Sequence, residues 1–264
     1  MTKQTQYVAK QPDEQGIIHY TPSENAVWES LVRAQAPAVK QHMCQEFLDG
    51  LETLQLPTDR IPQCSEISKV LKKTTGWKVE PVPALIGFKR FFTMLSERTF
   101  PAASFIRNPE ELEYLEEPDI FHEVYGHTPL LTHPVFADFT QMIGLAGLNA
   151  NPTDHVWLAR LYWMTIEFGL IRTSSGLKAY GAGLASSMEE LPYAVDSHIP
   201  VRQTFDILEA LRTPYKINIL QPVYFVLNDF NELLSLNPAK IIRMIRQAQA
   251  MGLRPPLYDV QEVI

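Results

Sequence analysis

The spacing of hydrophobic residues along this chain predicts a mainly helical protein. Apolar positions recur at intervals of three and four residues over most of its length, which is the period of one face of an α-helix. The first helix should begin after Thr21, because Thr21 and Glu24 have the spacing of a capping box and Pro22 occupies the first helical position. We expect Pro37 to restart or kink this helical region and Pro57 to end it.

Six more segments have helical spacing. Ser65 and Gly76 are typical of the start and the end of one of them, and Asp154 is a suitable N-cap for another. Pro118 interrupts a pattern that begins near Asn108. The expected helical segments are residues 65–77, 88–100, 108–127, 133–148, 154–171 and 237–252.

Strand-like patterns are few and lie late in the chain. They are the glycine-rich residues 177–184 and residues 215–227, where Ile217, Ile219 and 224–226 are the strand-like positions. Residues 79–87 are punctuated by proline and should be extended. The predicted fold class is therefore mainly α (α+β), with a small minor β-sheet. We expect a single domain over residues 21–264, preceded by a flexible N-terminal arm at residues 1–20.

Composition and charge narrow the function. Of the 264 residues, 45% are hydrophobic and 20% are charged, which is typical of a globular protein. The chain has no apolar run long enough to span a bilayer, and its N-terminus lacks the apolar core of a secretory signal, so we expect a cytoplasmic location and no membrane partner. Cys44 and Cys64 are predicted to be thiols. A net charge of −7 without a basic block argues against nucleic acid and favours a small-molecule partner.

The segment Phe-His-Glu-Val-Tyr-Gly-His places two histidines, His122 and His127, five residues apart. The zinc-peptidase pattern needs a step of four, and in an α-helix a step of five overshoots the same face by roughly 140°. The two imidazoles therefore meet only if the helix breaks or bulges between them, for which Gly126 is well suited. The alternative is a pair of histidines that caps a helix end through local hydrogen bonds.

Glu167 lies in a segment that is apolar on almost every side. An unpaired buried carboxylate is costly, so Glu167 needs a partner, which is either Arg160, Arg172 or a metal cation. Two histidines and one carboxylate, with open positions left over, are the ligands of non-haem Fe(II) oxygenases. The residues alone leave open both a metal centre and a salt-bridged core glutamate.

Other polar residues near these positions also have two interpretations. Asp119 and Glu123 either complement the helix dipole or support a histidine or a polar cofactor. Arg107 either pairs with nearby glutamates or binds a substrate carboxylate through two nitrogens. Residues 180–187, rich in glycine and serine, form either a turn or a place where a ligand approaches the backbone closely.

Three segments together resemble a known family. They are residues 118–131 (PDIFHEVYGHTPLL), 162–170 (YWMTIEFGL) and 178–191 (KAYGAGLASSMEEL). In this order, and with forty residues between His127 and Glu167, they resemble the catalytic domain of the tetrahydropterin-dependent aromatic amino acid hydroxylases, and the bacterial members that act on phenylalanine most of all. The similarity covers roughly residues 80–230.

The resemblance implies an enzyme that hydroxylates L-phenylalanine to L-tyrosine. It implies one Fe(II) ion held by His122, His127 and Glu167, a tetrahydropterin cofactor, and O2 as co-substrate. The same chemistry on tyrosine or tryptophan is the nearest alternative. A zinc hydrolase that uses the same three residues and a non-catalytic helical binding protein are the alternatives outside the family.

The resemblance also implies two groups of binding residues. Trp163 and Phe168 match pocket aromatics that sandwich the substrate ring, and Phe91 matches the residue that stacks on the pterin. The implied substrate-binding residues are Arg107, Asp119, Trp163, Phe168, Gly183 and Ser186, and the implied cofactor-binding residues are Ala84, Ile86, Phe91, Glu123 and Tyr162.

Two departures from the animal members of the family are visible. Leu115 stands where they carry a threonine near the substrate. The short flanks of the similar region predict no separate regulatory or tetramerisation domain, and hence a monomer or a small homo-oligomer. Pterin-recycling enzymes are the expected functional partners.

Overall fold

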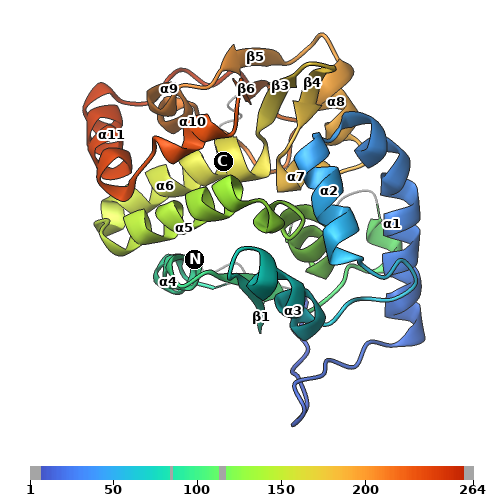
Figure 1. Cartoon of the computed structure of the whole chain (residues 1–264). Coiled ribbons are helices and arrows are strands. Elements are labelled where there is room, and N and C mark those ends of the chain that lie inside the picture. The colour runs from blue at the N-terminus through green and yellow to red at the C-terminus, as the bar shows by residue number, and fades with distance from the viewer. Residues whose placement is uncertain (1–6, 84–85, 113–116, 259–264) are drawn as a thin grey trace, which may run out of the picture.

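The structure, a computed structural model, describes residues 7–83, 86–112 and 117–258. Ala84 and Leu115, which the resemblance singles out, lie outside these ranges. Helices dominate and the strands form two small sheets, so the predicted α+β class is confirmed (Figure 1). Among the described residues, the helices are α1 (Pro22–His42), α2 (Gln45–Leu54), α3 (Cys64–Thr74), α4 (Phe88–Ser96), α5 (Pro134–Leu148), α6 (His155–Tyr162), α7 (Ala182–Ala185), α8 (Glu190–Asp196), α9 (Ile207–Arg212), α10 (Asn231–Leu234) and α11 (Pro238–Met251).

Helix α1 begins as its sequence predicts. The Glu24 backbone N–H donates to Thr21 Oγ1 at 3.2 Å, and the Thr21 N–H donates to the Glu24 carboxylate at 2.6 Å. The predicted restart at Pro37 is wrong, because α1 continues through this residue to His42. Proline removes one helical hydrogen bond, but buried side chains on both sides of it, such as Leu31 and Val39, keep the helix packed on the core.

Helix α3 begins two residues earlier than predicted, and α6 begins at its predicted cap. Gln63 rather than Ser65 caps α3, and its N–H donates to the Glu66 carboxylate at 2.8 Å. Asp154 is at the N-cap position of α6, as predicted, but its side chain caps the preceding 3₁₀ turn instead: it accepts the N–H of Asn151, the N-cap of that turn, at 3.0 Å. In both cases an acidic residue at the third helical position selects the residue three places before it as the cap.

The two sheets contain strands that the sequence pattern identifies only in part. The prediction at residues 224–226 is confirmed, but Ile217 and Ile219 lie in a turn and the strand predicted at 177–184 ends at Ala179. The strands that were not predicted are four or five residues long, and one of them, Thr99–Ala103, is buried at every position, so it shows no alternation of period two. The strands are β1 (Lys78–Val82), β2 (Thr99–Ala103), β3 (Leu170–Thr173), β4 (Gly176–Ala179), β5 (Val201–Thr204) and β6 (Val223–Leu227).

The elements are arranged around a central pair of helices. Strands β1 and β2 form a parallel pair, and the second sheet has the order β4-β3-β6-β5, with β3 antiparallel to β4 and parallel to β6. In Figure 1, α5 and α6 cross the middle of the molecule, with the four-stranded sheet on one side and α3, α4 and β1 on the other. One cluster of buried hydrophobic residues extends from Val27 to Ala248.

The described part of the N-terminal segment, residues 7–20, contacts the rest of the protein. Ile18 is buried and exchanges hydrogen bonds with the Gln63 side chain at 2.9 and 3.0 Å, and the ring of Tyr7 stacks on Phe105 with centroids 4.5 Å apart. The flexibility of this arm stays a prediction.

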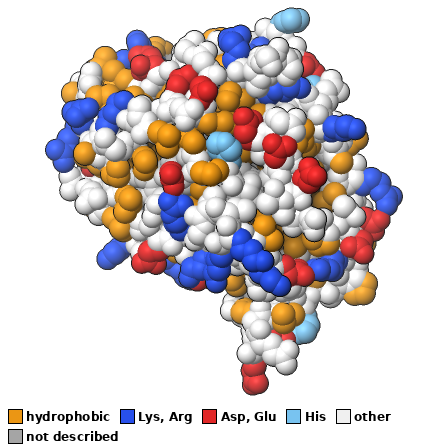
Figure 2. Space-filling view, viewed as in Figure 1, with side chains coloured by type: hydrophobic (Ala, Val, Ile, Leu, Met, Phe, Trp, Pro, Cys, Tyr) orange, Lys and Arg blue, Asp and Glu red, His pale blue; other side chains and the backbone are white. Residues whose placement is uncertain are grey.

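The surface in Figure 2 carries acidic, basic and hydrophobic side chains intermingled over the visible face. Within the part of the chain that the structure describes, no helix combines the length and the apolar character needed to cross a bilayer. Cys44 and Cys64 are buried free thiols, which confirms that prediction.

Candidate metal centre

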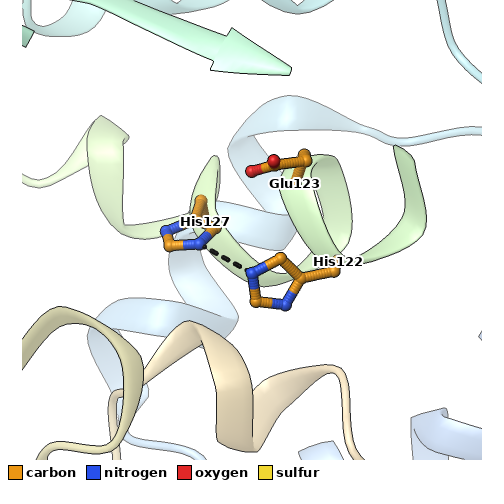
Figure 3. A group of neighbouring side chains, drawn as sticks. All are labelled: His122, Glu123 and His127. Atoms are coloured by element: carbon orange, nitrogen blue, oxygen red, sulfur yellow. Dashed lines mark hydrogen bonds between the residues drawn. The ribbon is translucent and has the colours of Figure 1, made fainter. Parts of the chain in front are cut away.

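Residues His122–His127 form a π-helical turn instead of α-helix. In a π-turn the hydrogen bonds run from residue i to residue i+5, so side chains five residues apart come to nearly the same face. The Nε2 atoms of His122 and His127 are consequently 3.1 Å apart, as the dashed line in Figure 3 shows. The predicted bulge between the two histidines is therefore confirmed.

Gly126 has a different role in this turn from the predicted one. Its φ is not among the positive values of the described glycines, so it does not break the helix. A Cβ at this position would lie 2.8 Å from the backbone oxygen of Ala182 in α7. Glycine is needed here because α7 packs directly against the π-turn.

A second π-helical turn, Trp163–Glu167, continues α6 and presents Glu167 to the histidines. Glu167 Oε1 is 3.1 Å from His127 Nε2, and Glu167 Oε2 is 3.6 Å from His122 Nε2. The predicted arginine partners are wrong. The guanidinium of Arg160 lies over the Trp157 ring at 4.9 Å, and Arg172 is exposed.

The spacing of these three groups fits a single metal ion. Two ligand atoms that each lie about 2.1 Å from a metal, at right angles, are about 3 Å from each other. The atoms of His122, His127 and Glu167 are 3.1 to 3.6 Å apart and come from two different helical turns. This arrangement occupies one face of an ion and leaves the opposite face free.

Hydrogen bonding sets the tautomer of His122. Its Nδ1 is 2.9 Å from Ser186 Oγ, and the Ser186 hydroxyl donates to the Ala182 carbonyl at 3.0 Å. The Ser186 oxygen therefore accepts a hydrogen bond from the Nδ1–H group, which leaves the Nε2 lone pair directed at the centre. Burial lowers the pKa of His122 to about 4, so the ring is neutral at pH 7.

Glu167 carries the negative charge of the centre. Burial alone would raise its pKa, but the neighbouring His127 and His122 and a hydrogen bond from the Gly183 N–H outweigh burial and lower the pKa. An ionised carboxylate beside two imidazole nitrogens is a ligand set that attracts a divalent cation.

A second carboxyl group, that of Glu123, borders the same histidines. Its ligand atom lies within 4.8 Å of those of His122 and His127, and Figure 3 shows it on the same turn as His122. Burial, with the charges of Glu167 and Asp119, raises the pKa of Glu123 well above its ordinary value. Glu167 is both closer to the histidines and ionised, so it is the better third ligand, and Glu123 is a neutral neighbour.

Asp119 connects the first π-turn to Arg107. The buried Asp119 carboxylate accepts hydrogen bonds from Arg107 Nε at 2.8 Å, from Arg107 Nη2 at 3.0 Å and from the His122 N–H at 3.1 Å. Burial opposes its ionisation, but the Arg107 charge and these hydrogen bonds keep the pKa of Asp119 below its ordinary value. Asp119 thus both caps the helix and orients Arg107.

A cavity of about 320 Å³ opens beside the metal-ligand candidates His122 and Glu167. Trp163 and Phe168 form an aromatic wall, but their ring centroids are 4.5 Å apart. The predicted sandwich is wrong in this conformation, because two rings in contact leave no space for a third between them. Five of the six predicted substrate-binding residues line the cavity: Arg107, Trp163, Phe168, Gly183 and Ser186. The sixth, Asp119, binds Arg107 and is not among the lining residues.

Three of the predicted pterin residues, Phe91, Glu123 and Tyr162, lie near the histidines and are not among the residues that line this cavity. The Phe91 ring meets Tyr162 edge-on with centroids 5.4 Å apart, and the Tyr162 ring lies 6.1 Å from His127. Ile86 is half-buried two residues before α4. The structure thus brings Phe91, Tyr162 and Glu123 close to the centre on a side distinct from the cavity.

Several residues of the cavity wall were not predicted. They include Glu190 and the turn at 217–220. Two further residues that were not predicted contact Trp163: Tyr215 stacks on the indole at 4.4 Å, and Gln221 accepts the indole N–H at 3.2 Å. The alternating apolar residues of 215–220 resemble a strand, so no local pattern marks them as part of a pocket.

The fold and the site define a mononuclear, non-haem metal centre of two histidines and one carboxylate at the edge of a pocket lined by aromatic residues. The model of the biopterin-dependent aromatic amino acid hydroxylases matches residues 2–247. The chain belongs to this family. The predicted pterin requirement is confirmed by this membership, which contradicts both the zinc hydrolase and the non-catalytic binding protein.

Individual relatives are similar over nearly their whole length. A phenylalanine-4-hydroxylase of Pseudomonas aeruginosa is 53% identical over 260 residues, which are 98% of this chain and 99% of the relative. The apo structure of the cold-active phenylalanine hydroxylase from Colwellia psychrerythraea is 50% identical, with a TM-score of 0.92 over 95% of this chain and 97% of that one. The Chromobacterium violaceum phenylalanine hydroxylase with bound oxidised Fe(III) is 37% identical, with a TM-score of 0.88 over 96% of this chain and 92% of that one.

Proposed function

We propose that this protein is an iron- and tetrahydropterin-dependent monooxygenase that converts L-phenylalanine to L-tyrosine. The observation that carries the proposal is the convergence of His122, His127 and Glu167 to within 3.1 to 3.6 Å beside an aromatic pocket. The relatives named phenylalanine hydroxylases favour phenylalanine over tyrosine or tryptophan as the substrate.

His122, His127 and Glu167 are the iron ligands in this proposal. The donor set of two imidazoles and one carboxylate suits Fe(II), and the Chromobacterium violaceum relative binds iron. Bound iron, with the reduced pterin and O2, supplies the oxidising chemistry. The Ser186 hydroxyl oxygen accepts a hydrogen bond from His122 Nδ1–H, and this keeps the Nε2 lone pair available for the metal.

Arg107 and the aromatic wall position the amino acid. Asp119 engages Nε and Nη2 of Arg107. Within the described residues Nη1 makes a long 3.4 Å hydrogen bond to the Leu112 carbonyl, so it has a proton to donate to a substrate carboxylate. The substrate ring lies against the face of the Trp163–Phe168 pair, not between the two rings. Gly183 and Ser186 complete the wall next to the ligands.

The pterin occupies the side of the histidine pair where Phe91 and Tyr162 lie. Phe91 stacks on the pterin ring. Burial raises the pKa of Glu123 and so favours its protonated form, which can donate a hydrogen bond to a pterin heteroatom. Ile86 and Ala84 border this side in the proposal, as the resemblance implies.

The proposal also covers the cellular location, the partners and the domain organisation of the enzyme. We place it in the cytoplasm, with pterin-recycling enzymes as functional partners, as a monomer or small homo-oligomer. The two buried free thiols support a reducing compartment. The continuous buried cluster from Val27 to Ala248 supports a single catalytic domain over residues 21–264.

The test is anaerobic reconstitution with Fe(II), followed by assay with tetrahydropterin, O2 and each of the three aromatic amino acids. Tyrosine formation from phenylalanine is expected, and His122→Ala and Glu167→Ala should each lose both iron binding and activity while staying folded. His198→Ala, which removes an exposed histidine, is the matched control and should retain both. Stoichiometric iron and full activity in both ligand variants would contradict the assignment.

A further inference from the structure

Gln221 adjoins the turn at 217–220 that lines the cavity, and it lies immediately before Pro222 and strand β6. Its side chain is 2% exposed, and each of its polar groups has a partner. The amide oxygen accepts the indole N–H of Trp163 at 3.2 Å. The amide nitrogen donates to the carbonyls of Lys216 and Ile219, both at 2.9 Å.

These hydrogen bonds join two parts of the wall that come from distant regions of the sequence. Residues 217–220 line the cavity as an irregular turn, and Ile217 is 46% exposed. Trp163 lines the cavity from the second π-turn and lies four residues before Glu167. A single buried amide therefore sets the separation between the turn and the indole.

The backbone of Gln221 is fixed by the buried Glu190 carboxyl group. The Gln221 N–H donates to Glu190 Oε1 at 2.8 Å, and the same oxygen accepts the Tyr224 hydroxyl at 2.8 Å. Trp163 is also stacked on Tyr215, with ring centroids 4.4 Å apart. The indole is thus held by ring contacts with Tyr215 and Phe168 and by one hydrogen bond, and the hydrogen bond fixes its position relative to the turn at 217–220.

We propose that Gln221 is a positioning residue that sets the width of the aromatic pocket by bonding Trp163 to the turn at 217–220, and so determines the affinity for the amino acid substrate. The inference depends on the proposed function, because it takes this cavity as the site of the amino acid. Gln221 contacts no metal ligand, so its loss should weaken amino acid binding while leaving iron and pterin binding in place.

The test compares Gln221→Met with the wild-type enzyme loaded with iron. Methionine keeps the length and volume of the side chain and removes its hydrogen bonds. Leaving buried carbonyls and an indole N–H without partners should raise the KM for phenylalanine about tenfold, with kcat and the KM for the pterin within about twofold of wild type. Gln141→Met is the matched control, because Gln141 is half-buried on α5 and donates only to the Ser96 carbonyl at 3.0 Å.

A double-mutant cycle separates positioning from general destabilisation. Trp163→Phe keeps a ring in the wall but lacks the N–H, so Gln221→Met should raise the KM for phenylalanine less in this background than in the wild type. Gln221→Asn keeps the amide on a side chain that is too short to reach both Trp163 and the turn. It should raise the KM for phenylalanine more than the KM for the pterin, and it replaces Gln221→Met if that variant does not fold.

Two outcomes are distinguishable from each other. A wild-type enzyme that forms no tyrosine from phenylalanine would overturn both the proposed function and this inference. An active wild type whose Gln221 variants show only a lower melting temperature, or equal increases in KM for phenylalanine and pterin, or additive effects with Trp163→Phe, would overturn the positioning role alone.

Discussion

Glu190 makes the stability of this protein depend on pH in a direction opposite to that of most carboxyl groups. The side chain is 7% exposed and accepts hydrogen bonds from the Gln221 N–H and the Tyr224 hydroxyl. Burial raises the pKa of Glu190 from its ordinary 4.5 to about 7, and the two hydrogen bonds offset burial only in part. The folded protein therefore binds this proton more tightly than the unfolded chain does.

The sign and the size of the effect follow from this difference. A raised pKa in the folded state gives a stabilisation that is complete below pH 4.5 and is lost as the pH rises through about 7. The difference between the two pKa values corresponds to about 3 kcal/mol in all. Between pH 5 and pH 8 the free energy of unfolding should therefore fall by about 2 to 3 kcal/mol because of this group.

Glu190→Gln removes the titration and keeps an oxygen that can accept both hydrogen bonds. Urea denaturation at pH 5, 6, 7 and 8 should show the wild type losing about 2 to 3 kcal/mol relative to the variant over this range. Glu52→Gln, at an exposed position in α2, is the control and should follow the wild-type curve. Parallel curves for Glu190→Gln and wild type would show that this carboxyl titrates alike in the folded and unfolded states, and would refute the reasoning.

Two further substitutions test the support of the metal centre. Ser186→Ala removes the acceptor for the Nδ1 proton of His122, so Fe(II) affinity measured by titration should fall about 10- to 100-fold with the fold intact, and unchanged affinity would remove Ser186 from this role. Gly181→Ala would place a Cβ 2.2 Å from the backbone oxygen of Glu167, so the melting temperature and the iron content should both fall, whereas Gly87→Ala, with no atom within 4 Å of the added Cβ, should change neither. A Gly181→Ala protein with wild-type stability and iron content would show that the two segments can separate without cost.

The helices could be predicted from the sequence because their signals are local. The capping box of Thr21 and Glu24 and the apolar period of α5 and α11 need only neighbours within a few residues. The short strands could not be predicted in the same way, because β2 is buried at every position and β3 and β5 are only four residues long. The turn at 217–219 was mistaken for a strand because its alternation of apolar and polar residues reflects a cavity wall and not a sheet face.

While leaving both a metal cation and an arginine open as the partner of Glu167, the sequence by itself determined that His122 and His127 meet only if the helix between them is interrupted and that a buried Glu167 needs a partner. That conclusion needs only helical geometry and the cost of burying a charge. The tertiary structure decided how the histidines and Glu167 meet. The two π-turns that carry them both pack against α7, where Gly126 lies against Ala182. The tertiary structure also decided that the Arg107 fork is held by Asp119 and that Gln221 joins the pocket wall. These choices depend on contacts between segments distant in sequence, for which no local pattern exists.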